Sequence, residues 1–152
     1  MISETDCLFC RLIAREGDVS VVHEDARTTT IMDTQPVQSG HMLVLPRVHA
    51  SRLADLDPED GAQVFRVAHA AAASLRASGL PCEGVNLFLA DGEAAGQEED
   101  HVHLHVWPRS AGDGFGLRLP PDYATRPRSE LDAAAEALRR SWPSSPHPGE
   151  PG

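Results

Sequence analysis

Runs of β-branched and aromatic residues, separated by polar turns, predict five strands in this chain. The first two runs, residues 19–25 and 27–33, have acidic turn residues between them and predict a hairpin. The remaining strands are expected over residues 41–49, 84–91 and 101–107. Between the last two strands lies a Gly- and Ala-rich connection, "DGEAAGQEED". Short strands joined in this way favour a mainly antiparallel sheet.

Helical spacing of apolar positions predicts one long helix between the third and fourth strands. Asp57 is a suitable N-cap, Pro58 suits the first turn, and Gly79 ends the pattern. The apolar stripe of this helix, which should face the core, consists of Val64, Ala68, Ala71 and Leu75. A short helix is expected over residues 7–17, and a final one over 129–141, begun by Ser129 in a capping box with Asp132.

The order of these elements places the chain in the α+β class, with a mainly antiparallel sheet, one long helix and one short one. Its 152 residues suit one domain, expected over residues 1–142. The last stretch, "PSSPHPGEPG", predicts a disordered tail over residues 143–152, where His147 needs no function.

Composition narrows the classes of function. The formal charge is −10, and all 13 positive residues are arginine. Such an acidic chain is a poor partner for duplex nucleic acid, which requires a basic face. No apolar run is long enough to span a membrane, and no signal sequence opens the chain, so we expect a soluble cytoplasmic protein without a membrane partner. Three cysteines do not make a disulfide framework.

The most informative stretch is "HVHLHV", where histidines occupy every second position. On a strand, His101, His103 and His105 share one face, with α-carbons roughly 6.5–7 Å apart. The intervening Val102, Leu104 and Val106 then face the core. Three interpretations follow: a polar strand face, a metal site, or covalent catalysis, in which a neutral imidazole attacks phosphorus.

The chain resembles the histidine triad (HIT) nucleotide hydrolases and transferases. The motif "HVHLHV" fits their alternating histidine pattern, and "CLFCRLIAREG", "IMDTQPVQSGHMLVLPRVH", "DGEAAGQ" and "GDGF" stand in the order expected of a bacterial member. The resemblance covers about residues 7–115. It implies a HIT-like fold, usually a homodimer, that binds a purine nucleotide. It also implies attack on the α-phosphate through a nucleotidyl-histidine intermediate.

The resemblance assigns residues to these tasks. His103 matches the nucleophile, and His105 matches the histidine that contacts the phosphate and assists the reaction. Asp33 matches the acid that binds the ribose hydroxyls. The loop that meets the phosphates matches Gly96, Gln97 and Glu98, and the base pocket matches Leu8, Phe9, Leu12, Ile31 and Leu43.

His101 is assigned a different task. In family members with an N-terminal CxxC, both cysteines, a histidine after the third strand and the first triad histidine bind zinc. Here these are Cys7, Cys10, His49 and His101, a closed four-ligand set typical of structural Zn²⁺. The alternatives are a pair of reduced cysteines or a redox CxxC, although no thioredoxin-like context accompanies it.

Two departures from the family pattern leave the substrate open. Ala90 stands where many members have an amide side chain against the phosphate. Glu98, Glu99 and Asp100 place three acids beside the triplet, which should repel a polyphosphate more than a monoanion. The first hypothesis is a hydrolase of nucleoside phosphoramidates or phosphate esters. The alternatives are a dinucleoside polyphosphate hydrolase, a nucleotide-binding regulatory protein with vestigial catalysis, and a purely structural zinc domain.

Overall fold

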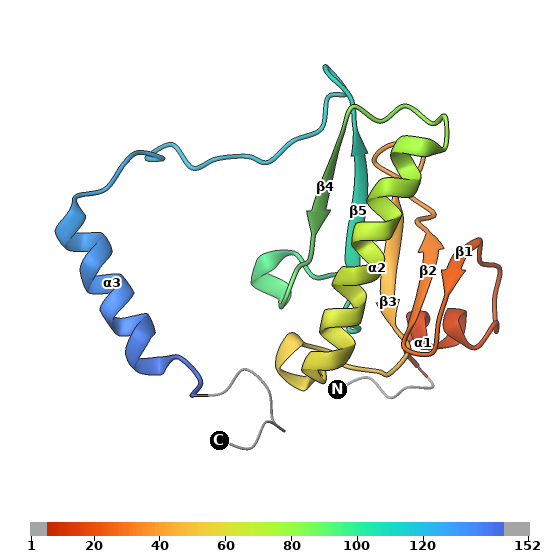
Figure 1. Ribbon diagram of the computed structural model, residues 1–152, viewed down its shortest axis with the longest axis horizontal. Coiled ribbons are helices and arrows are strands. Elements are labelled where there is room, and N and C mark those ends of the chain that lie inside the picture. Colours follow the sequence, from red (N-terminus) through yellow and green to blue (C-terminus); the bar gives the residue numbers. More distant parts are fainter. Residues whose placement is uncertain (1–5, 145–152) are drawn as a thin grey trace. The chain divides into compact units, whose positions relative to one another are not determined.

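The computed structural model describes residues 6–144 of the chain. The chain divides into two compact units, residues 1–113 and 114–152. The first unit contains the complete sheet and two α-helices, and the second contains one α-helix (Figure 1). The predicted domain over residues 1–142 remains a prediction, and most of the expected tail, residues 145–152, lies outside the described residues.

The five strands form one antiparallel sheet with the order β1-β2-β3-β5-β4. Their bounds are Val21–Glu24 for β1, Thr28–Met32 for β2, Met42–Pro46 for β3, Gly84–Phe88 for β4 and Leu104–Arg109 for β5. The insertion of β5 between β3 and β4 places the end of the loop over residues 89–103 inside the sheet and not at its edge. The predicted α+β class with a mainly antiparallel sheet is confirmed.

The long helix α2, Pro58–Ala77, packs on one face of the sheet (Figure 1). Asp57 caps it as predicted, because its carboxylate accepts from the N–H of Glu59 at 2.8 Å. Its apolar stripe meets alternate strand residues in a core cluster made of Met42, Val44, Val64, Val67, Ala68, Ala71, Leu75, Leu104 and Val106. Because Leu104 and Val106 of β5 pack against this stripe, the alternate residues of β5 point away from α2.

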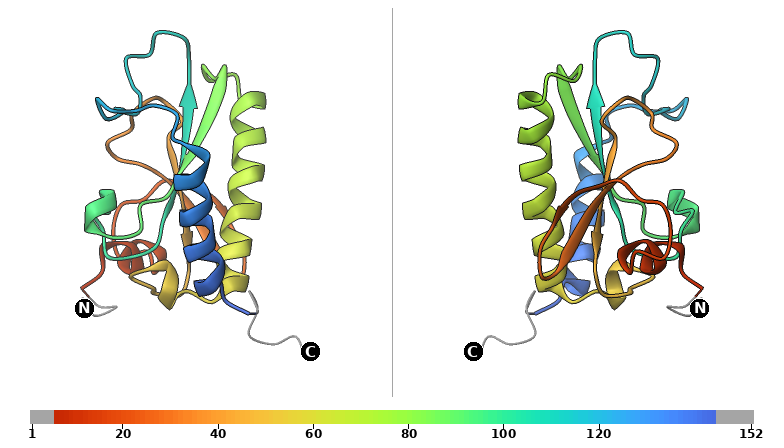
Figure 2. Two further views of the ribbon diagram at one scale, coloured as in Figure 1. Left: turned by 90° about the vertical axis from the view of Figure 1, so that its left-hand side faces the viewer. Right: turned by 90° about the vertical axis from the view of Figure 1, so that its right-hand side faces the viewer.

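The short helix α1, Leu8–Ile13, lies on the opposite face of the sheet (Figure 2). It is shorter than the expected range of 7–17 because Arg15 adopts a left-handed backbone with φ 65°. The N–H of Arg15 then bonds to the carbonyl of Leu12, and that of Glu16 to the carbonyl of Arg11. This pair of bonds is a Schellman ending, with arginine at the position that usually holds glycine.

The histidine triplet stands at the entrance of a strand instead of inside it. Strand β5 begins at Leu104, so the expectation of a strand from residue 101 is wrong at its start. The cause is local: the N–H of Val102 bonds to the carbonyl of Ala50 in a loop, and the ladder to β3 begins with Leu104 opposite Val44. The alternation of faces still holds, since Val102, like Leu104 and Val106, belongs to an apolar cluster.

The second unit contains α3, Arg128–Ser141, so the described residues hold three α-helices, two of them long. Its N-cap is Pro127, without a side-chain bond, so the expected capping box from Ser129 does not form. Glu136 instead pairs with Arg139 and Arg140 along the helix surface. Among the described residues, no helix is both long and apolar enough to cross a bilayer.

Candidate active site and metal centre

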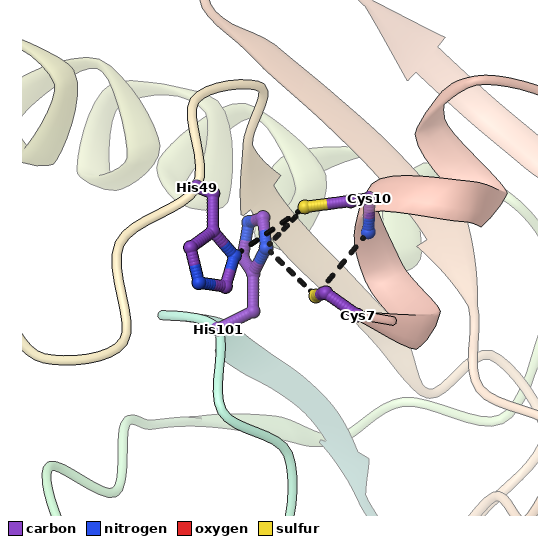
Figure 3. A group of neighbouring side chains, drawn as sticks. All are labelled: Cys7, Cys10, His49 and His101. Atoms are coloured by element: carbon purple, nitrogen blue, oxygen red, sulfur yellow. Dashed lines mark hydrogen bonds between the residues drawn. The ribbon is translucent and has the colours of Figure 1, made fainter. Parts of the chain in front are cut away.

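Two cysteines and two histidines meet at the start of α1 (Figure 3). Cys7 is the N-cap of this helix and Cys10 lies one turn further, so both sulfurs point to the same side. His49 comes from the loop after β3, and His101 from the segment before β5. The four predicted metal ligands are therefore brought together from three separate parts of the chain.

The separations in this cluster suit a tetrahedral zinc ion. The Nδ1 atom of His101 lies 3.5 Å from the sulfur of Cys7 and 3.5 Å from that of Cys10. His49 Nδ1 lies 3.4 Å from Cys10 Sγ. Ideal Zn–S and Zn–N bonds at a tetrahedral angle place sulfur and nitrogen about 3.6 Å apart. Two thiolates and two imidazoles, at these separations and with Cys7 and His101 buried, fit Zn²⁺ in a closed site.

The second nitrogen of His101 fixes how this ring takes part. Its Nε2–H donates to the backbone carbonyl of Pro46 at 2.9 Å, which leaves the Nδ1 lone pair facing the sulfurs. The ring is fully buried, and burial is the main cause that lowers the pKa of His101 to about 4. His101 is thus held neutral, with a donor atom directed at the cluster, as a metal ligand requires.

His103 has the opposite arrangement. Its Nδ1–H donates to the backbone carbonyl of His101 at 2.7 Å, so Nε2 carries the lone pair. Phe9, from α1, packs against the ring edge with 5.1 Å between ring centres. The side chain is only 5% exposed, yet it lines a cavity, and no described residue bonds to its Nε2. In its neutral form His103 therefore presents an oriented Nε2 lone pair to whatever enters that cavity.

The cavity has a volume of about 840 Å³, which suits a nucleotide-sized ligand. Most of the predicted nucleotide-binding residues line it: Leu8, Phe9, Leu12, Ile31, Asp33, Leu43, Gly96, Glu98, His103 and His105. Apolar side chains of α1, β2 and β3 form one wall. The exception is Gln97, which does not line the cavity.

Gln97 instead holds its own loop together. Its amide nitrogen donates to the carbonyls of Ser51 and Glu99, and its amide oxygen accepts from the N–H of Gly92 at 2.8 Å. Arg52 donates to the same oxygen and to the carboxylate of Asp100 at 2.8 Å. The side chain of Gln97 thus has no unused amide hydrogen for a ligand. The charge of Asp100 is paired with that of Arg52, and Asp100 does not line the cavity. Ala90 is buried and does not line it either.

A fourth histidine, to which the sequence analysis assigned no role, belongs to the site. His41 is buried directly before β3, and its Nε2 lies 2.9 Å from Nδ1 of His105. Gly40 makes this position possible, because its φ is +100° and a Cβ there would lie 2.8 Å from Leu75 Cδ2. The register of β3 with β5 pairs Leu43 with His105, which puts His41 beside the triplet.

His41 determines which nitrogen of His105 carries a proton. Two N–H groups point at its ring: Val37 N–H at Nδ1, 3.2 Å away, and Trp107 Nε1–H at Nε2, 2.8 Å away. A neutral imidazole has one such lone pair, so only one of these groups is bound at a time. If Trp107 is bound, Nε2 of His41 is an acceptor and has no proton to donate to His105. If Val37 is bound, Nε2–H of His41 donates to Nδ1 of His105, whose Nε2 then carries the proton.

Burial is the main cause that lowers the pKa of His105 to about 4, and the neighbouring His103 and His41 add to the effect. Burial also lowers the pKa of His41, although Asp33 opposes this shift. Asp33 Oδ2 lies 3.4 Å from His41 Nε2. Asp33, His41 and His105 are close enough to share a cation, but Nε2 of His41 already faces the Trp107 donor. The group is therefore better explained as a network of neutral rings beside one carboxylate.

With this geometry in place, the family is clear. The model of the HIT domain matches residues 14–112. An uncharacterized HIT-like protein of Mycobacterium tuberculosis is 36% identical over 136 residues, which cover 86% of this chain and 94% of that protein. The chain belongs to the HIT domain family.

Solved structures agree with the fold. A member of the HIT family from Bacillus subtilis superposes with a TM-score of 0.83 at 29% identity, covering 92% of this chain and 99% of that one. A zinc-bound histidine triad family protein from Mycobacterium smegmatis gives a TM-score of 0.72 at 35% identity, covering 92% of this chain and 100% of that one.

Some relatives have names that state an activity, an adenylylsulfatase of Arabidopsis thaliana among them. An adenosine 5′-monophosphoramidase of Candida albicans is 29% identical over 126 residues, covering 80% of this chain and 83% of that protein. The family therefore includes nucleotide-cleaving enzymes.

Proposed function

We propose that this chain is a nucleotide hydrolase that cleaves purine nucleoside phosphoramidates or phosphate esters at the α-phosphate. One observation carries the proposal. The Nδ1–H of the buried His103 donates to the carbonyl of His101, so in the neutral ring Nε2 carries the lone pair, and the side chain lines the cavity. An imidazole fixed in this way needs no deprotonation before it attacks phosphorus.

The reaction takes place in two steps. His103 Nε2 bonds to the α-phosphorus while the bond from phosphorus to the leaving nitrogen or oxygen breaks, and the leaving atom takes up a proton. Water then attacks the same phosphorus, the P–Nε2 bond breaks, and the nucleoside monophosphate leaves a neutral His103. The water gives up one proton to solvent, which replaces the proton that the leaving atom took from solvent in the first step. His105, beside His103 with 4.9 Å between ring centres, contacts the phosphate through its Nε2.

The rest of the cavity suits the nucleotide. The apolar wall that includes Leu8, Phe9 and Leu12 accommodates the base. Asp33 would accept hydrogen bonds from the ribose hydroxyls, although one of its oxygens already accepts from the N–H of Gln35 at 2.7 Å. The activity that the Candida albicans relative is named for supports a phosphoramidate substrate.

We propose that the cluster of Cys7, Cys10, His49 and His101 binds a structural zinc ion. The sulfur–nitrogen separations and the second hydrogen bond of His101 support this assignment. When bound, the ion would supply a cross-link between α1, the loop after β3 and the segment before β5. It has no open position for substrate, so it takes no part in the chemistry.

We further propose a cytoplasmic homodimer. Strand β4 supports association, because it is an edge of the sheet and exposes Leu87. A sedimentation mass equal to one chain at micromolar concentration would contradict the dimer.

A substrate panel tests the proposed activity. We expect kcat/KM to be highest for adenosine 5′-phosphoramidate, and lower for diadenosine polyphosphates and adenylyl sulfate, with guanosine analogues as a measure of base preference. A covalent nucleotidyl group on His103 should be trapped by rapid denaturation in alkali and lost in acid. Tight nucleotide binding without turnover of any substrate would instead show a regulatory protein with vestigial catalysis.

A further inference from the structure

The charges around the cavity are unusual for a site that receives a phosphate. Four carboxylates line it, those of Asp18, Asp33, Glu98 and Glu99. No arginine is among the described residues that line it, and the chain has no lysine. The ring of His105, which would contact the phosphate, is neutral at physiological pH because burial lowers its pKa to about 4.

Three arginines from segments that adjoin the lining residues are paired elsewhere. Arg15 pairs with Glu24 at 2.6 Å, and Arg52 with Asp100 at 2.8 Å. Arg11 lies 3.9 Å from Glu16. None of the three lines the cavity. These arginines are thus not placed to offset the carboxylates of the cavity, and a positively charged ligand would be attracted by them.

The carboxylates fall into two groups with different neighbours. Asp33 lies beside His41 and is the proposed ribose acceptor. Glu98 and Glu99 belong to the loop that leads into His101, and no described side chain makes an ion pair with either. Glu98 is exposed and Glu99 is half-buried, so their carboxylates border the opening of the cavity. His103, with its unpartnered Nε2, lines the same cavity and marks where phosphorus must lie.

We propose that Glu98 and Glu99 select substrates whose leaving group carries a positive charge, such as an amine with a second, free ammonium group. This inference rests on the proposed hydrolase activity and names its substrate class. In an in-line displacement the leaving group departs on the side opposite the attacking Nε2, toward the open part of the cavity. An ammonium there is attracted by both carboxylates, whereas a carboxylate, sulfate or phosphate is repelled.

Three substrates with the same four-carbon chain test the charge. They are the adenosine 5′-phosphoramidates of putrescine, butylamine and γ-aminobutyrate, whose free ends are positive, neutral and negative. Each of the two carboxylates should change kcat/KM by about threefold for each unit of charge. For the parent we therefore expect about tenfold between the putrescine and butylamine compounds, and a similar step to γ-aminobutyrate, both reduced by high salt.

The variant Glu98→Gln/Glu99→Gln should bring the putrescine-to-butylamine ratio of kcat/KM close to one. Glu93→Gln is the matched control, because Glu93 is an exposed acid of the same loop that does not line the cavity. It should leave the ratio at the parent value. Zinc content and melting temperature of each variant show whether it has folded.

Equal kcat/KM for the three compounds in the parent would overturn this inference and leave the proposed hydrolase intact. A charge preference that survives in Glu98→Gln/Glu99→Gln would also overturn it, since another group would then be responsible for the preference. If the folded parent cleaves none of the three, the proposed phosphoramidate hydrolysis fails, and this inference fails with it.

Discussion

His101 and His103 are two residues apart in one segment, yet their rings carry the proton on opposite nitrogens. His101 donates from Nε2 to the carbonyl of Pro46, and its Nδ1 faces two sulfurs in a closed cluster. His103 donates from Nδ1 to the carbonyl of His101, and its Nε2 faces an open cavity. A backbone carbonyl therefore decides which of the two nitrogens each ring makes available.

The comparison shows how one residue type serves two kinds of site. A closed set of four ligands leaves a metal no position for substrate, so its effect is on folding. A single lone pair at the wall of a cavity leaves room for a substrate, so its effect is on chemistry. The two sites share a backbone segment, but no side chain belongs to both. Substitutions should therefore separate stability from turnover.

The largest expected effect is on turnover, from His103→Ala. The variant loses the attacking nitrogen but keeps the proposed zinc ligands and the apolar face of the segment. We expect kcat to fall by several orders of magnitude while zinc content and nucleotide affinity stay close to the parent. His69→Ala, on the exposed surface of α2, is the control and should change neither. Near-parental turnover of His103→Ala would exclude the covalent route.

His105→Ala should have the second largest effect, about 10²- to 10⁴-fold in kcat, because it removes phosphate contact and assistance but not the nucleophile. Steady-state and single-turnover rates on one phosphoramidate would measure it. A loss as large as that of His103→Ala would mean that the two rings act as one unit.

Loss of the metal site should act on stability instead. Cys7→Ser/Cys10→Ser should remove about one zinc per chain and lower the melting temperature, while some nucleotide binding remains. Cys82→Ser is the matched control, since Cys82 lies outside the cluster. Metal analysis of protein prepared without chelators, together with thermal unfolding, gives both results. A parent protein that contains no zinc would contradict the assignment.

Much of this comparison could be predicted from the sequence. Spacing alone predicts that the three histidines share one face. The sequence also predicts the N-cap Asp57 and the apolar stripe of α2 correctly. The resemblance to a family supplied the four ligands of the proposed zinc site, which come from separated segments. No periodicity argument could have joined Cys7 to His101, because their contact depends on tertiary packing.

Other features depend on strand register, which the sequence does not specify. His41 joins the site only because Leu43 pairs with His105, so a shift of one residue would have turned it to the other face. The side chain of Gln97 was expected at the phosphate, but its amide forms hydrogen bonds with the backbone of Ser51, Gly92 and Glu99 instead. The left-handed Arg15 shortened α1, where a glycine would have given a clear signal.

Asp33→Ala should affect binding more than chemistry, and so sharpen the contrast between the nucleophile and the rest of the cavity. We expect KM for ribonucleotides to rise by roughly tenfold or more, with little change for 2′,3′-dideoxy analogues, which lack the hydroxyls. Measuring both substrate series separates this from a structural role. Equal losses on both series would show that Asp33 mainly holds the turn at Gln35, whose N–H it accepts.

The smallest expected effect is a pH dependence of stability that comes from His105. Its pKa is lowered from 6.5 to about 4 in the folded chain, chiefly by burial. Between these values the unfolded chain binds the extra proton, so the stability that the neutral ring contributes is complete above pH 6.5 and lost as the pH falls toward 4. The upper limit is about 3 kcal/mol. Solvent at the cavity wall should reduce it to about 1 kcal/mol.

Urea unfolding at about pH 7 and about pH 5 measures this dependence. His105→Gln should unfold with a smaller difference between the two pH values than the parent. His69→Gln, whose ring is exposed, should keep the parental difference. If His105→Gln also keeps it, the ring is not the group that is held neutral, and the buried His41 and His101, whose pKa values are lowered too, must account for the dependence.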